Sequence, residues 1–147
     1  LNCKLTFKNV SDGPVTFQLF NIVDFDLGGT LSNDVATVID TAAVRMQQND
    51  AVGDTNPFAQ HFGQGATAYE VGSSFPLRTK ASSGAANLNN TATFTGDCAS
   101  AMQWTLTLQP GESRVIYSGI GFNAEALPEP ASLALLALGG LLAMRRR

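Results

Sequence analysis

Polar and apolar residues alternate along most of the chain up to residue 127, and this period of two is typical of β-strands. Residues 4–10 place Leu5, Phe7 and Asn9 on one face, and the Ser-Asp-Gly-Pro cluster at 11–14 then ends the run. Residues 15–27 are richer in Val, Ile and Phe, and they predict a long central strand. Further runs of β-type composition lie at residues 35–46, 67–71, 91–94, 102–108 and 113–122.

The spacing of these runs predicts an all-β fold. Roughly seven short strands separated by loops rich in Gly, Asn, Ser and Asp are typical of an antiparallel β-sandwich of jelly-roll or immunoglobulin-like type. We also predict a hairpin in which residues 102–108 pair with residues 113–117 across a type II turn, with Gly111 at the position of positive φ. No segment before Ala131 has helical periodicity.

The last twenty residues follow a different pattern. Prolines flank Glu129, and because each ring restricts φ and removes a backbone donor, the tripeptide Pro128, Glu129, Pro130 should be extended and accessible. Residues 131–144 carry no charge, so a helix there would be apolar on every side and would need lipid or a protein interior around it. The leucines of this segment are Leu133, Leu135, Leu136, Leu138, Leu141 and Leu142. The basic end, Arg145, Arg146 and Arg147, would stay on the cytoplasmic side by the positive-inside rule.

This order of motifs resembles the PEP-CTERM sorting signal of Gram-negative bacteria, which combines a Pro-Glu-Pro motif, a short hydrophobic helix and an Arg-rich end. The resemblance is confined to residues 128–147, where 128–130 match the motif, 133–144 the helix and 145–147 the basic end. It implies a partner, exosortase, a membrane-embedded cysteine protease-transpeptidase that recognises the motif, cleaves near it and passes the protein to the cell surface. It also divides the chain into an exported β-sandwich domain, residues 1–127, and a sorting signal, residues 128–147.

The length of the apolar segment leaves two other interpretations open. A helix of 14 residues spans about 21 Å, whereas a bilayer core of about 30 Å needs roughly 20 residues. A buried core helix or an ordinary tail anchor would also account for such a segment, although three arginines directly after Met144 are unusual at the end of a buried helix. Snorkelling of the arginines reduces the difference between the length of the helix and the thickness of the bilayer core. A marginal anchor also suits a segment that is held in the membrane briefly and then removed.

Residues 1–127 contain six Lys or Arg and eleven Asp or Glu, which gives the exported domain a formal charge of −5. Such an acidic domain does not suit nucleic acid, which requires a basic surface. The first ten residues alternate instead of forming the apolar core of a signal peptide, so we expect a signal peptide, and one or more strands, upstream of Leu1. The expected route is export across the inner membrane, transient anchoring by the C-terminal helix, and delivery to the cell surface or the extracellular space.

The two cysteines, Cys3 and Cys98, lie far apart in the sequence. In an oxidising compartment a disulfide between them would close a long loop and would contribute about 2–4 kcal/mol. The alternative is two unpaired thiols, or a partner upstream of Leu1. Neither cysteine has a second sulfur or a histidine at the spacing of a metal site.

Few residues point to chemistry of their own. His61 is the single histidine, in a loop-like segment at residues 56–63 without a nucleophile motif, so we interpret it as a surface residue and expect no enzyme activity. Asp24 and Asp26 share one face of a predicted strand and could help hold Ca²⁺, with Asp12 and Asp34 as further ligands. A solvated strand end that prevents edge pairing is the alternative, and no other cofactor is expected.

Aromatic side chains offer a second kind of site. Tyr69, Phe75, Trp104 and Tyr117 could stack on sugar faces if they are exposed, although Trp104 alternates with Met102, Leu106 and Leu108 as a core residue would. Two classes of function follow for the exported domain. One is a structural or adhesive component of the cell surface, associated with exopolysaccharide or biofilm. The other is a secreted enzyme, or a specific carbohydrate- or Ca²⁺-binding module, whose site lies partly upstream of Leu1.

Overall fold

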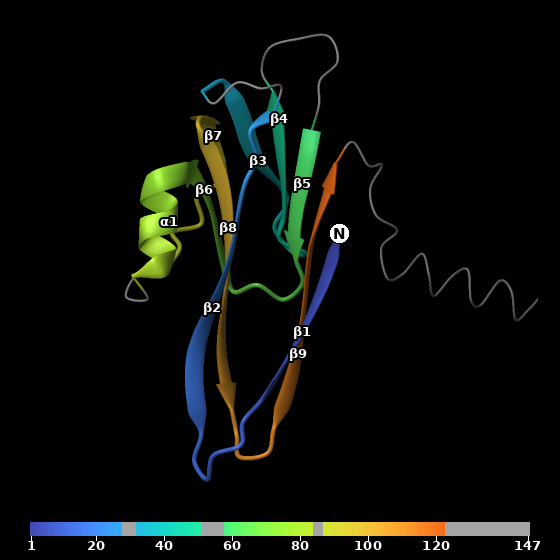
Figure 1. Cartoon of the computed structure of the whole chain (residues 1–147), viewed down its shortest axis with the longest axis vertical. Coiled ribbons are helices and arrows are strands. Elements are labelled where there is room, and N and C mark those ends of the chain that lie inside the picture. Colours follow the sequence, from blue (N-terminus) through green and yellow to red (C-terminus); the bar gives the residue numbers. More distant parts are fainter. Residues whose placement is uncertain (28–31, 51–57, 84–86, 123–147) are drawn as a thin grey trace, which may run out of the picture.

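The computed structural model describes residues 1–27, 32–50, 58–83 and 87–122, which form two β-sheets and one short helix (Figure 1). The elements are β1 (Asn2–Lys8), β2 (Val15–Asp24), β3 (Asp34–Asp40), β4 (Arg45–Asp50), β5 (Phe58–Gly63), β6 (Ala68–Ser73), α1 (Ser74–Ser82), β7 (Thr93–Gly96), β8 (Cys98–Leu108) and β9 (Ser113–Phe122). The described strand pairings are antiparallel, which confirms the expected antiparallel all-β fold.

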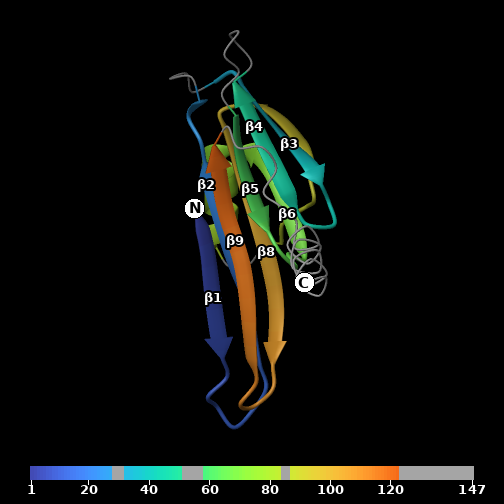
Figure 2. The same cartoon turned by 90° about the vertical axis from the view of Figure 1, so that its right-hand side faces the viewer.

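The two sheets lie face to face, and α1 covers the outer face of the smaller one (Figures 1 and 2). The larger sheet has the strand order β1-β9-β5-β4-β3-β7, and the smaller sheet has the order β2-β8-β6. The chain passes repeatedly from one sheet to the other, because β1 belongs to the larger sheet, β2 to the smaller and β3 again to the larger. The molecule therefore has three layers, formed by the helix, the small sheet and the large sheet.

The main core lies between the two sheets. Trp104 and Met102 of β8 point into it and are almost completely buried, as the alternation of residues 102–108 predicts. The indole Nε1 of Trp104 donates a hydrogen bond to the carbonyl of Gln64 at 2.9 Å, so the one polar atom of this side chain has a partner. The large sheet contributes Met46 and Ile116 to the same cluster.

A second apolar cluster lies between the small sheet and α1. Its members, here called the outer cluster, are Leu77, Leu88, Ala99 and Ala101, with Phe20, Ile22 and Ala68 packed against them. The central strand β8 is therefore covered on both faces, by the large sheet and by the helix. This explains why its first seven residues are all buried.

The helix α1 corrects the prediction that no helix precedes Ala131. Its buried side chains are only Ser74, Leu77 and Ala81, a stripe too narrow and too polar to stand out as helical periodicity. Pro76 lies in its first turn, where the missing backbone N–H removes no helical hydrogen bond.

The predicted hairpin between residues 102–108 and 113–117 is wrong, although the turn that joins them is confirmed. Gly111 has φ of 78°, and the Glu112 N–H donates to the Gln109 carbonyl at 2.9 Å, as a type II turn requires. Strands that follow such a turn splay apart, because their right-handed twist matches turns of types I′ and II′. Accordingly β8 pairs with β2 and β6, whereas β9 pairs with β1 and β5 in the other sheet.

Two predicted strands also differ in extent or place. The run at residues 35–46 is divided into β3 and β4 by a turn, in which the carboxylate of Asp40 accepts the N–H groups of Ala42 and Ala43 at 2.8 and 3.1 Å. The run at residues 15–27 ends as a strand at Asp24, and β2 is an edge strand of the small sheet and not a central one. The predicted segment at 131–144 lies outside the described residues.

Candidate functional site

The first turn of α1 is fixed to the end of β2. The backbone N–H of Ser74 donates to the carbonyl of Asp97 at 3.1 Å, and its hydroxyl donates to the Asp24 carboxylate at 2.5 Å. Leu77 and Ala81 are buried on the side of the helix that faces the small sheet. The position of α1 is thus set by apolar contacts along its length and by hydrogen bonds at its start.

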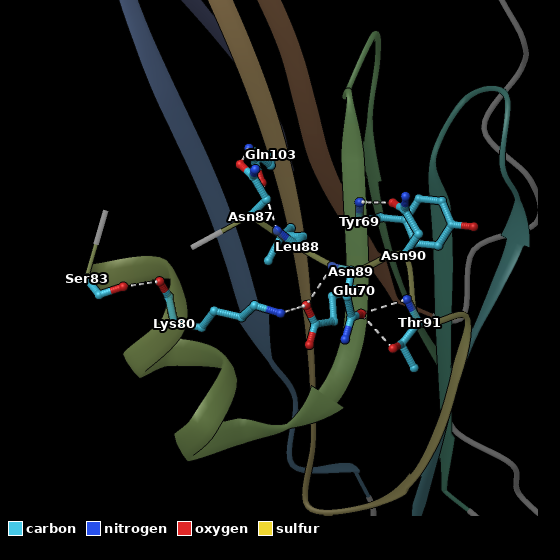
Figure 3. A network of polar contacts seen from close by, with 10 residues as sticks. All are labelled: Tyr69, Glu70, Lys80, Ser83, Asn87, Leu88, Asn89, Asn90, Thr91 and Gln103. Atoms are coloured by element: carbon cyan, nitrogen blue, oxygen red, sulfur yellow. Dashed lines mark hydrogen bonds and ion pairs between the residues drawn. The ribbon is translucent and has the colours of Figure 1, made fainter. Parts of the chain in front are cut away.

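The last turn of α1 is held by a polar network (Figure 3). The ammonium of Lys80 lies 2.6 Å from the Oε2 atom of Glu70 on β6, and the backbone N–H of Asn89 donates to the same oxygen at 3.0 Å. In the same loop the N–H of Leu88 donates to the side-chain carbonyl of Gln103 at 2.9 Å. The network therefore joins the helix, β6, β8 and the loop at 87–91 into one unit.

The outward face of α1 forms one wall of an open groove of about 670 Å³. Phe75, Arg78, Thr79 and Ser82 follow the i, i+3, i+4, i+7 spacing of one helical face. Ile22 and Asp24 of β2 line the same groove. The Phe75 side chain is 79% exposed, which is unusual for a large aromatic residue.

Asp24 also belongs to an acidic cluster with Asp26 and Asp97, whose carboxylate oxygens lie within 4.8 Å of one another. Asp24 is the last residue of β2, and Asp97 immediately precedes β8, which pairs with β2. Three exposed carboxylates at this distance offer oxygen ligands of the kind that Ca²⁺ and Mg²⁺ prefer. This part of the chain can therefore hold a metal ion.

The prediction from sequence identified Asp24 and Asp26 but missed Asp97, and the two further aspartates it suggested lie elsewhere. Asp12 precedes β2, whereas Asp24 ends it, and a strand of ten residues spans about 30 Å. Asp34 is buried, and its Oδ2 atom accepts hydrogen bonds from the Gln48 side chain at 2.6 Å and from the Leu27 N–H at 3.5 Å. Burial raises the pKa of Asp34, and the nearby carboxylates of Asp50 and Asp26 add to this effect.

His61 is not a surface residue of a loop, as the sequence suggested. It lies on β5, is 1% exposed, and its Nδ1 atom is 2.9 Å from the hydroxyl of Ser100 on β8. Burial lowers the pKa of His61 to about 4, so the imidazole is neutral at pH 7. Its Nε2 atom has no hydrogen-bond partner among the described residues, and the small void that it lines with Gln48 and Ser100 is too narrow for water.

Both cysteines are free thiols, so the expected bridge between Cys3 and Cys98 is not formed in this structure. Cys3 is exposed on β1 of the large sheet, whereas Cys98 is buried at the start of β8 in the small sheet. The Cys98 thiol donates to the carbonyl of Asp34 at 3.2 Å, and burial raises its pKa. A protonated, buried thiol of this kind acts as a small core residue.

The four aromatic residues suggested for sugar stacking are divided by their burial. Trp104 is 1% exposed and packs in the main core, and Tyr69 packs against the same cluster. Tyr117 is 45% exposed on the outer face of β9, with the Lys4 ammonium 6.0 Å above its ring. Phe75 alone of the four adjoins the groove at α1.

Sequence reasoning missed the polar partners of Phe75. Arg78, Thr79 and Ser82 lie on one face with Phe75 only because residues 74–82 form a helix. Their spacing of i+3, i+4 and i+7 from Phe75 is the one sequence signal for this face, and in a short polar segment it is weak. The sorting motif, the apolar segment and the basic end at 128–147 lie outside the described residues. Within the described residues, no helix is long and apolar enough to cross a membrane.

Among known proteins, no family model matches the chain and no curated protein is similar to it. Inference about function therefore rests on the chain's own residues and their geometry.

Proposed function

We propose that this chain is an exported protein of the cell surface or extracellular matrix, sorted by an exosortase and acting in a structural or adhesive role. The observation that carries this proposal is the order of three unlike segments in residues 128–147: Pro-Glu-Pro, an uncharged apolar run, and three arginines. The antiparallel β-fold and the acidic composition of the preceding domain suit such a role, because a formal charge of −5 on residues 1–127 does not favour nucleic acid as a partner. The alternation of the chain between two sheets supports the finer jelly-roll or immunoglobulin-like assignment.

The sorting role is tested by Glu129→Ala in the full-length protein, expressed in the cells that produce it. We expect the variant to remain in the inner-membrane fraction with its tail uncleaved, whereas the unchanged protein reaches the surface. Glu125→Ala is the matched control, since it removes an acidic side chain of the same segment outside the Pro-Glu-Pro motif. Normal cleavage and surface delivery of the Glu129→Ala protein would contradict the proposal.

A second candidate function is Ca²⁺ binding by Asp24, Asp26 and Asp97. The specific observation in its favour is the convergence of three carboxylates from two paired strands and their flanks. Asp24 and Asp26 are close in sequence, but Asp97 joins them only through the pairing of β2 with β8. A bound ion would relieve the repulsion among the three charges and would stabilise the junction of these strands.

Thermal unfolding of the full-length protein with and without CaCl₂ tests this function. We expect Ca²⁺ to raise the melting temperature of the unchanged protein and of Asp12→Asn, which alters an aspartate near the other end of β2. Asp97→Asn should abolish the increase. An equal increase in both variants would show that Ca²⁺ acts elsewhere, and MgCl₂ at the same concentration separates ion selectivity from ionic strength.

A further inference from the structure

The groove between α1 and β2 combines chemical groups that rarely occur together on a protein surface. The Phe75 side chain is exposed to solvent, and Arg78 and Asp24, which line the same groove, form a loose ion pair at 3.8 Å. The hydroxyls of Thr79 and Ser82 continue the same wall. An apolar face next to a few oriented polar groups is the usual composition of a small-ligand site.

The polar groups of the groove retain capacity for a ligand. The 3.8 Å separation of Arg78 and Asp24 is longer than a hydrogen bond, and the Arg78 side chain is 67% exposed. The described contacts of Asp24 use its Oδ2 atom, which leaves the acceptor capacity of Oδ1. Thr79 and Ser82 donate their hydroxyl protons to helix carbonyls, so their oxygens can still accept.

These groups match the two surfaces of a sugar ring. A donor-only guanidinium beside an acceptor-only carboxylate can bind two neighbouring hydroxyls, each of which both donates and accepts. The C–H face of a pyranose carries partial positive charge, which suits the negative face of an aromatic ring. The groove is also open to solvent, so an internal segment of a polymer can enter it without a free chain end.

Charge selects among saccharides. Arg78 and Asp24 neutralise each other, and Asp26 and Asp97 lie on the Asp24 side of the groove. With a formal charge of −5 on residues 1–127, the domain would repel a polyanion such as a polyuronate. A neutral polysaccharide meets no such repulsion.

From this geometry we infer that the groove between α1 and β2 binds neutral polysaccharide, with one pyranose ring stacked on Phe75 and its hydroxyls held by Arg78 and Asp24. The inference deepens the proposed surface role. It rests on that role only for the compartment, the cell surface, in which the protein would encounter the polymer. Because α1 is fixed at both ends, by Ser74 to Asp24 and by Lys80 to Glu70, the groove is formed before the polymer arrives.

The test is retention of the purified full-length protein in native gels cast with dextran as the neutral polymer or alginate as the polyuronate. A detergent without a sugar headgroup keeps the C-terminal segment in solution and does not compete for the groove. We expect retention by dextran, little retention by alginate, and a dissociation constant for dextran at least about ten-fold weaker in Phe75→Ala. Arg78→Gln, which keeps a long polar side chain without the charge, should also weaken retention.

Tyr117→Ala is the matched control, because it removes a partly exposed aromatic ring from the other sheet. It should bind dextran as the unchanged protein does, and all variants should keep the same melting temperature. Equal losses in Phe75→Ala and Tyr117→Ala, retention by alginate in preference to dextran, or no retention by dextran would each overturn the inference. Failure here is distinct from failure of sorting, since Phe75→Ala should still reach the surface and Glu129→Ala should still bind dextran.

Discussion

The imidazole Nδ1 of His61 and the hydroxyl of Ser100 are 2.9 Å apart, and this hydrogen bond joins the two sheets through the middle of the molecule. His61 lies on β5 of the large sheet, and Ser100 lies on β8 of the small sheet. Both side chains are almost completely buried. The contact therefore places a titratable group between the sheets, where its charged form lacks water.

We predict that His61 makes the fold sensitive to acid. Its pKa is lowered by burial to about 4, below the usual value of 6.5, so the unfolded chain binds this proton more readily than the folded one. The resulting stability is fully present above pH 6.5 and falls as the pH is lowered toward 4, by about 3 kcal/mol in total. Urea denaturation at a series of pH values measures this loss.

The matched comparison is His61→Gln, which keeps a polar side chain that does not titrate. The unfolding free energy of the unchanged protein should decrease relative to that of the variant as the pH falls from 6.5 to 4. Asp34 acts in the opposite direction, because its raised pKa adds stability on acidification, but it does so equally in both proteins. A constant difference across this range would contradict the role of His61.

A second prediction concerns Gly63, which faces the largest side chains of the core. A Cβ atom at this position would lie 2.3 Å from the Met102 sulfur and 2.6 Å from the Trp104 ring. The ring cannot easily move away, since its Nε1 atom is bonded to the Gln64 carbonyl. Gly63→Ala should therefore lower the unfolding free energy by about 1–3 kcal/mol or more.

Gly72→Ala is the control for this change. Gly72 also lies in a strand, but a Cβ atom there would meet no heavy atom within 4 Å. Its effect on the melting temperature should be small or slightly stabilising, because alanine restricts the unfolded chain more than glycine does. Equal destabilisation by the two substitutions would show that the contact with Met102 and Trp104 does not determine the result.

The surroundings of Gly63 also explain what the sequence could not predict. Alternation revealed the strands whose inward residues are large, and it correctly placed Trp104 and Met102 in the core. In β5 the inward residues are Ala59, His61 and Gly63, which are small or polar because the opposite sheet already fills the space. The inward residues of such a strand are chosen to fit side chains that are distant in the sequence, so the strand has no large apolar residues at alternate positions, and its sequence resembles that of a loop.

Pairings between distant segments were similarly hidden. Asp24 and Asp26 could be found from their spacing, but Asp97 reaches them only through the register of β2 against β8. The turn after Leu108 did carry usable information, since a type II geometry disfavours a simple hairpin. The type II turn was predicted correctly from its residues, but the prediction that β8 and β9 pair with each other was wrong, because they lie in different sheets.

A third prediction concerns Asn9, whose side chain connects the turn after β1 to the end of β8. Its side-chain NH₂ donates to the carbonyls of Gly13 at 2.8 Å and Leu108 at 2.9 Å, and its Oδ1 accepts the Ser11 N–H at 2.9 Å. Asn9→Ala removes these hydrogen bonds, of which the one to the Leu108 carbonyl is buried, and it should lower the unfolding free energy by about 1–3 kcal/mol. Asn2→Ala, at an exposed residue of β1, should change it by less than about 0.5 kcal/mol in the same urea titration.

The last prediction compares two ion pairs of similar length and different burial. Lys80 and Glu70 are 2.6 Å apart with side chains 25% and 13% exposed, and Glu70 also accepts the Asn89 N–H. Arg114 and Glu112 are 2.9 Å apart with side chains 56% and 33% exposed. Solvent screens the second pair more strongly, so it should contribute less to stability than the first.

Glu70→Gln should therefore lower the unfolding free energy by about 1–3 kcal/mol, because it leaves the Lys80 ammonium partly buried beside a neutral amide. Glu112→Gln should have a much smaller effect. Hydrogen exchange provides a second measurement, since loss of the Lys80 contact loosens the last turn of α1 and should speed exchange of the Ser83 N–H, which is bonded to the Thr79 carbonyl at 3.0 Å. If both substitutions destabilise the protein equally and leave exchange in α1 unchanged, the ion pair between Lys80 and Glu70 does not hold the last turn of the helix.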